Sequence, residues 1–232
     1  MLLVAASCVV LILPAKTRQG IDFQVTEYRI PLYVKAIDFL QRHYQYELLA
    51  SRICAGKTED ADCVAAIFDW TQESIPPTPP GWRVVDDHVL NIIIRGHGKS
   101  DQMADVFTTL STYAGMPAFF KRIKAYGRGD EIVLSFARVG GTWTAFDVER
   151  HVAFKDRTGK FAGVDALIAD PALVDAQTET TLPQGAPYSA FVSKATLLPF
   201  APPTASHADL QQPWPRIRYE VRKLMGLAGT QE

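Results

Sequence analysis

Residues 96–120, GHGKSDQMADVFTTLSTYAGMPAFF, contain the pattern that decides the fold. Gly96 and Gly98 permit backbone angles that other residues resist, which predicts a tight turn. Ser100 and Asp101 are typical of a helix start, and the apolar residues that follow recur at helical spacing. These apolar residues are Met103, Val106, Phe107, Leu110 and Tyr113. A glycine and a proline then end the predicted helix.

The chain after this helix predicts antiparallel strands. The β-prone runs cover residues 118–124, 131–139 and 142–148. The dipeptide Gly140-Gly141 separates the last two runs and indicates a hairpin turn. A helix packed against an antiparallel sheet is therefore expected, which is an α+β arrangement.

Helices are expected on both sides of this region. Apolar spacing predicts one or two helices over residues 28–50, with Pro31 in a first turn. A second helix is predicted over 59–73, followed by the stop signal IPPTPP. Residues 81–101 are expected to begin extended or irregular and to end in the glycine turn. Further along, helices are predicted near 164–168 and over 216–227, with a weakly periodic Pro- and Ala-rich stretch between them.

Four stretches together resemble the transglutaminase-like superfamily, whose fold is related to that of papain. CVAAIFDWTQESI (63–75) is similar to the leading helix, and residues 96–120 to the helix that carries the nucleophile. EIVLSFARVGG (131–141) and GTWTAFDV (141–148) are similar to the strands that supply histidine and aspartate. The resemblance covers roughly residues 60 to 150 and implies an α+β fold with a helical N-terminal part.

The resemblance also implies a catalytic triad. A family cysteine at a helix start attacks an acyl carbonyl, and an aspartate holds the histidine in the useful tautomer. The cysteine position falls on Ser100, the aspartate position on Asp147, and the histidine position near Ile132. Because no histidine lies between His97 and His151, two of the three members are changed. A serine without an adjacent base is a poor nucleophile at neutral pH.

Other interpretations of these residues remain open. Ser100 would serve as a helix cap, and Asp147 as a turn residue at a strand end. His88 or His97 would replace the missing base, with His88 the better candidate because two carboxylates precede it. Either histidine would equally serve a surface or loop-stabilising role.

Polar and aromatic residues gather before Ser100, where loops on a rigid scaffold often bind ligands. The predicted catalytic residues are Ser100, Asp147 and His88. The predicted substrate-binding residues are Trp82, Asp87, His97, Asp101 and Trp143. No metal site or cofactor is predicted, because no second cluster completes the acidic pair beside His88.

The sequence also divides into segments. Residues 1–18 begin with an uncharged apolar run and are expected to be a clipped signal peptide, a membrane anchor within residues 1–15, or a hydrophobic start without either role. Residues 19–200 are expected to form the transglutaminase-like domain, and 201–232 a C-terminal extension with a terminal helix. Cys54 and Cys63 would form a disulfide in an exported protein, in the periplasm or cell envelope, or remain free thiols in the cytoplasm.

Three functions compete. The first is a catalytically degenerate domain that binds a peptide, glycan or protein partner in the former active-site cleft. The second is an active acyl-transferase or hydrolase with Ser100 as nucleophile. The third is a purely structural domain, which predicts an exposed apolar patch and no pocket near Ser100. Nucleic-acid binding is not expected, because the formal net charge is -1 and the basic residues are scattered.

Overall fold

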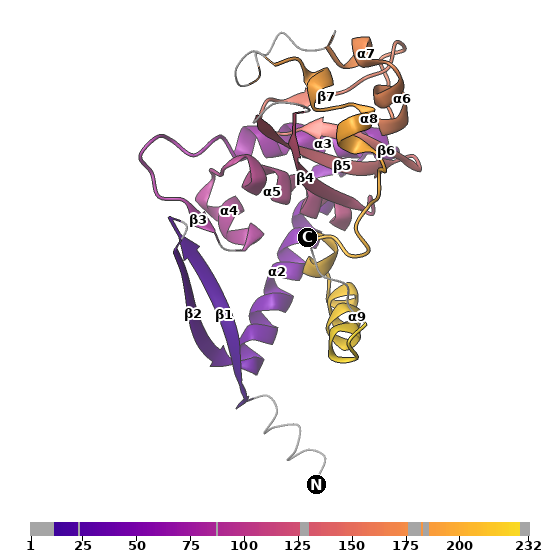
Figure 1. The fold of residues 1–232 in the computed structure, drawn as a ribbon. Coiled ribbons are helices and arrows are strands. Elements are labelled where there is room, and N and C mark those ends of the chain that lie inside the picture. The colour runs from indigo at the N-terminus through magenta and orange to yellow at the C-terminus, as the bar shows by residue number, and fades with distance from the viewer. Residues whose placement is uncertain are drawn as a thin grey trace.

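The computed structural model describes residues 12–22, 24–86, 88–125, 130–175, 182 and 186–227. In this part of the chain helices combine with two antiparallel sheets, so the fold is α+β (Figure 1). The strands are β1 (Pro14–Ile21), β2 (Gln24–Pro31), β3 (Val85–Asp86), β4 (Ala118–Lys124), β5 (Glu131–Val139), β6 (Thr142–Asp147) and β7 (Val152–Ala153). The helices are α2 (Leu32–Ile53), α3 (Asp60–Ser74), α4 (Val89–Arg95), α5 (Ser100–Tyr113), α6 (Val164–Ala169), α7 (Pro171–Asp175), η2 (Tyr188–Ala190), α8 (Lys194–Leu197), η3 (Asp209–Gln211) and α9 (Pro213–Leu224).

Helix α5 packs on one face of the larger sheet, whose strand order is β4-β5-β6-β7. Phe107 of α5 lies 5.0 Å from Phe146 of β6 and 5.9 Å from Phe68 of α3, measured between ring centroids. All three rings are buried, so α3, α5 and β6 share one apolar core. The predicted helix over 59–73 and the helix that starts at Ser100 are confirmed.

The other face of the same sheet is covered by the chain after β6. Phe136 of β5 is fully buried there, together with Phe154, Tyr188 and Phe191. The sheet therefore lies between two layers, with α5 on one side and residues from 152 to 200 on the other. Strands β4, β5 and β6 match the predicted runs and confirm the antiparallel hairpin at Gly140-Gly141.

The N-terminal part differs from the predicted helix over 28–50. Residues 28–31 belong to strand β2, and α2 begins only at Leu32, after Pro31 at its N-cap. Strand β2 pairs with β1 along its full length, and Glu27 bonds Lys16 and Arg18 across the pair. Strand β1 also crosses the expected segment boundary at residue 18. Cross-strand pairing is long-range, which is why local apolar spacing did not reveal it.

Two further elements correct the sequence interpretation. Within the segment 81–101, which was expected to begin extended or irregular and to end in a glycine turn, residues 89–95 form helix α4, which ends at Gly96 in the left-handed conformation. The C-terminal helix spans Pro213–Leu224 rather than 216–227, because Pro213 lacks a backbone N–H and suits a first helical turn.

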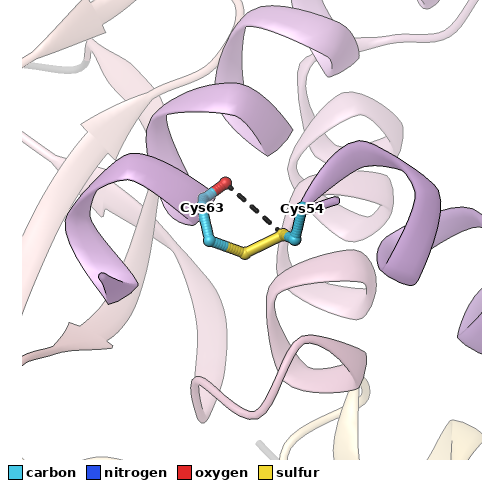
Figure 2. Close-up of a disulfide and its surroundings, with 2 residues drawn as sticks. All are labelled: Cys54 and Cys63. Atoms are coloured by element: carbon cyan, nitrogen blue, oxygen red, sulfur yellow. Dashed lines mark hydrogen bonds between the residues drawn. A yellow bond between two sulfur atoms is a disulfide. The ribbon is translucent and has the colours of Figure 1, made fainter. Parts of the chain in front are cut away.

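A disulfide joins Cys54, just after α2, to Cys63 in the first turn of α3 (Figure 2). It closes a short loop between the two helices and thereby fixes their ends. Of the two states left open by the sequence, the structure adopts the bonded one. Within the described residues, no helix is both long and apolar enough to cross a membrane.

Candidate functional site

The turn before α5 is tightly packed around Gly98. A Cβ there would lie 3.0 Å from Gln102 Cβ and 3.4 Å from Cγ2 of both Ile75 and Ile92. The Gly98 N–H donates to the carbonyl of Pro76 at 3.1 Å, and its carbonyl accepts from the N–H of Thr78 at 2.9 Å. The segment after α3 therefore fixes where α5 begins.

Ser100 is the first residue of α5, while Lys99 occupies the N-cap position. The Lys99 N–H donates to Gln102 Oε1 at 3.1 Å, so the glutamine side chain satisfies the helix start. Among the described residues none forms a hydrogen bond with Ser100 Oγ, and the capping interpretation of Ser100 is wrong. Ser100 is half-buried at the positive end of the helix dipole.

The predicted residues Trp82 and His97 do meet. Their ring centroids are 5.1 Å apart, and the edge of one ring faces the other. His97 is buried, and its Nδ1 lies 3.1 Å from Thr78 Oγ1. Burial, and next the charge of Arg95, lower the pKa of His97, so its imidazole is neutral at neutral pH. His97 therefore stabilises the turn from inside.

The other predicted residues of this loop are His88 and Asp87. His88 is the N-cap residue of α4. Asp87 falls outside the described residues, so its predicted binding role stays a prediction. The base role predicted for His88 also stays a prediction.

Asp147 is fully buried at the end of β6. Its Oδ1 accepts a hydrogen bond from the Arg150 N–H at 3.1 Å. Its Oδ2 accepts from Arg150 Nη1 at 3.0 Å and from Tyr188 Oη at 2.8 Å. In the described part of the chain, an arginine and a tyrosine thus occupy the carboxylate that would orient a histidine.

Alternation along β6 places Asp147 on the face away from α5. The side chains of Phe146 and Val148, on either side of it, belong to the core that contains α5. Tyr188, which bonds Asp147, belongs to the core on the other face. Neighbouring residues of a strand point to opposite faces. Asp147 and the start of α5 are therefore on different sides of the sheet.

The position expected for histidine belongs to the sheet interior. Ile132 is 2% exposed and packs in the core away from α5. The preceding residue, Glu131, lies 3.7 Å from Arg122 of β4. Arg122 also bonds Asp101, the residue after Ser100. Asp101, Arg122 and Glu131 thus form a charged link beside the start of α5, although they are far apart in the sequence.

Trp143, a predicted binding residue, packs in an aromatic group. Its ring centroid lies 5.2 Å from Phe119 and 6.2 Å from Phe200. These contacts account for its half-buried position on the sheet face away from α5. Among the described residues Trp143 makes no ring contact with the start of α5, so its role in substrate binding stays a prediction.

Glu149 is a titratable group that sequence reasoning missed. It is partly buried and lies 3.1 Å from Arg150 Nη1. Burial raises the pKa of Glu149, and the negative charges of Asp147 and Asp101 add to that effect against the opposing charge of Arg150. Glu149 thus lies within electrostatic reach of both Asp101, beside the α5 start, and the buried Asp147.

This raised pKa predicts a stability difference that depends on pH. Folded protein holds the Glu149 proton more tightly than unfolded protein, so stability contributed by Glu149 falls as pH rises from 4.5 through the raised value. Glu149→Gln has no proton to release at this position, so it does not show this pH-dependent loss of stability. Its free energy of unfolding, measured by urea titration and taken relative to wild type, should increase over that interval. A pH-independent difference between the two proteins would contradict the prediction.

Two cavities follow strand β4, which is the edge strand of its sheet. The larger, about 850 Å³, is lined by Phe119 and Phe120 and by residues 201–209 and part of α9. The smaller, about 530 Å³, is lined by residues 121–125 and 195–200. Lys121 Nζ donates to the carbonyl of Ala201 at 3.2 Å between the two. The β4 groove, as we name these two cavities together, reaches the α5 start through Arg122.

The described side chains include no group of three or more His, Cys, Asp or Glu residues that would hold a metal ion. Ser100 lines neither cavity of the β4 groove. Among the described strands β4 has no partner on its outer side, so the β4 groove lies beside a strand edge and next to the charged link of Arg122.

The amino-acid sequence matches no protein-family model and no curated protein. Solved structures with a similar chain path include a proposed protease from Parabacteroides distasonis ATCC 8503, with 13% identity and a TM-score of 0.37 over 57% of this chain and 35% of that chain. A proposed cysteine protease from Cytophaga hutchinsonii has 21% identity and a TM-score of 0.39 over 59% of this chain and 53% of that chain. A structure named as a TGase has 8% identity and a TM-score of 0.38 over 61% of this chain and 45% of that chain.

The aligned part thus spans between 35% and 53% of the length of these three chains. At these identities and TM-scores, the likeness carries no argument about activity.

Proposed function

We propose that this protein is a catalytically degenerate domain of transglutaminase-like, papain-related type, which binds an extended segment of a peptide or protein partner. The proposal rests on one observation: Arg150 and Tyr188 take up the carboxylate of Asp147. A triad needs that carboxylate to hold an imidazole. Here it stabilises the far face of the sheet instead.

The β4 groove supports an extended ligand. An edge strand presents unpaired N–H and C=O groups, and a peptide adds to such an edge through main-chain hydrogen bonds. The two cavities run beside β4 from Phe119 to Ala125 and offer room for side chains of a bound segment. Phe120 supplies an apolar contact, and Arg122 a charged one next to Asp101.

We also infer that the protein works in an oxidising compartment, as an exported or membrane-associated protein. The Cys54–Cys63 disulfide supports this location, because disulfides persist mainly outside the reducing cytosol. The uncharged apolar run before Lys16 agrees with export, although it lies mostly outside the described residues.

The first test is covalent labelling of the purified protein with a fluorophosphonate probe. Wild type should be labelled no more than Ser100→Ala, because a serine without a paired base is weakly nucleophilic. Labelling that disappears in Ser100→Ala would overturn the degenerate assignment and favour an acyl-transferase or hydrolase. His88→Ala and His97→Ala would then identify the base. Among the described residues Ser100 Oγ has no hydrogen-bond partner, and this observation at a helix start is what supports the second function.

The second step tests the β4 groove with a phage-displayed library of random peptides. Peptides enriched on wild type should lose at least about tenfold in affinity for Phe120→Asp, since a charge in an apolar contact opposes binding. Arg138→Asp serves as control, because Arg138 is exposed on β5 and does not line the groove. Equal binding to Phe120→Asp and wild type would place the partner elsewhere.

A further inference from the structure

Helix α9 carries an apolar face that the rest of the described chain leaves uncovered. None of its residues is buried. Five apolar side chains fall within one face at helical spacing, over α9 and the residue after it. They are Trp214, 67% exposed, Ile217, 54%, Val221, 47%, Leu224, 87%, and Met225, 58%.

The charged side chains of α9 are mainly basic. The acidic residue of the helix is Glu220, which pairs with Arg216 at 2.8 Å. Among the described residues, no carboxylate lies within ion-pair distance of Arg218, Arg222 or Lys223. The helix thus combines an exposed apolar face that begins with a tryptophan and an excess of cations on its flanks.

The place of α9 in the fold adds a second observation. Figure 1 shows α9 beside the N-terminal half of α2, on the side away from the β1–β2 hairpin. Burial, and next the charge of Arg216, lower the pKa of Lys35 in the first turn of α2. The Leu32 N–H donates to the carbonyl of Leu13 at 2.9 Å. Helix α9 therefore lies at the same end of the molecule as the point where the uncharged N-terminal sequence enters the described chain.

We propose that α9 is an interfacial helix that docks this protein onto an anionic phospholipid bilayer. A basic helix with an exposed apolar face and a tryptophan lies in the plane of the membrane interface, with its apolar side chains among the acyl chains. Its cations are attracted by anionic headgroups. Trp214, Arg218 and Arg222 also line the larger cavity of the β4 groove, whereas Ile217 and Val221 do not. Substitutions at Ile217 and Val221 therefore separate lipid docking from peptide binding in that groove.

Charge and burial together favour a lipid surface over a second copy of this chain. The formal net charge of the whole protein is -1, so basic helices gain no general attraction from another copy. An anionic bilayer supplies both the negative charge and the apolar layer that α9 requires.

The test is co-sedimentation of the purified full chain with vesicles of phosphatidylcholine, alone or mixed with phosphatidylglycerol. Wild type should bind the anionic vesicles at least about tenfold better, and added salt should weaken this binding. Arg218→Glu/Arg222→Glu should lower binding to anionic vesicles by about 30-fold or more. Ile217→Ser/Val221→Ser should lower binding by at least about tenfold.

The matched control is Arg52→Glu/Lys57→Glu, which makes the same change in net charge near the C-terminal end of α2. It should retain at least about half of the wild-type binding, because Arg52 lies in the last turn of α2 and Lys57 just beyond that helix, at the end opposite Lys35. Circular dichroism checks that every variant is folded. Equal binding by wild type and the α9 variants would overturn the proposal, as would equal binding to both vesicle types. Light scattering that shows a dimer lost in the α9 variants would assign the helix to a second copy instead.

Discussion

Asp147→Ala is expected to lower the free energy of unfolding by about 3–5 kcal/mol. The carboxylate is fully buried and accepts hydrogen bonds from both Arg150 and Tyr188. Its removal leaves the Arg150 guanidinium, whose side chain is only 17% exposed, with Glu149 as its remaining ion-pair partner. It also leaves the buried Tyr188 hydroxyl without its acceptor. Urea denaturation of the purified variant measures the loss.

Two variants distinguish this buried network from an ordinary surface pair. Asp170→Ala removes the partner of Arg157, whose side chain is 82% exposed, and should cost less than about 1 kcal/mol. Tyr188→Phe removes one hydrogen bond and should cost about 1–2 kcal/mol. If Asp147→Ala were no more costly than Asp170→Ala, the structural role assigned to Asp147 would be wrong.

The centre of the fold could be predicted because its signals are local. The glycine turn, the helix that begins at Ser100 and the hairpin at Gly140-Gly141 each follow from residues a few positions apart. Strand alternation and helical spacing report directly on which side chains are buried. The order of these elements therefore gave the α+β arrangement.

The N-terminal part could not be predicted in the same way. Residues 28–31 fit helical spacing, yet they pair with β1 through contacts between residues up to 17 positions apart, such as Pro14 with Pro31. Helix α4 is short and rich in isoleucine, a composition that also suits a strand. In both places tertiary context decided between two conformations that local pattern allowed.

The contacts of the candidate site also differ in whether they are local in the sequence. Arg150 lies three residues after Asp147, so their pair could have been found in the sequence as a turn contact. Tyr188 is 41 residues from Asp147, and Arg122 is 21 residues from Asp101, with no sequence signal for either pair. The Arg150 partner of Asp147 was thus within reach of sequence reasoning, whereas Tyr188 was not.

Phe146→Ala is expected to lower the free energy of unfolding by about 3–5 kcal/mol, since it opens a cavity where α3, α5 and β6 meet. The ring is fully buried and lies 5.4 Å from Phe68 and 5.0 Å from Phe107. Urea denaturation tests this, with Tyr44→Ala as control. Tyr44 is 62% exposed, so Tyr44→Ala should lower the free energy of unfolding by less than about 0.5 kcal/mol.

Phe146→Leu sharpens the same experiment, because leucine restores much of the lost volume and should recover part of the stability. A loss for Phe146→Ala no larger than that for Tyr44→Ala would contradict the placement of β6 against α5. Phe146 faces α5, whereas Asp147 faces the opposite core. Large losses from both neighbouring substitutions therefore require that each face of the sheet is covered. That requirement concerns the fold alone and would hold whether or not Ser100 reacts with an acyl substrate.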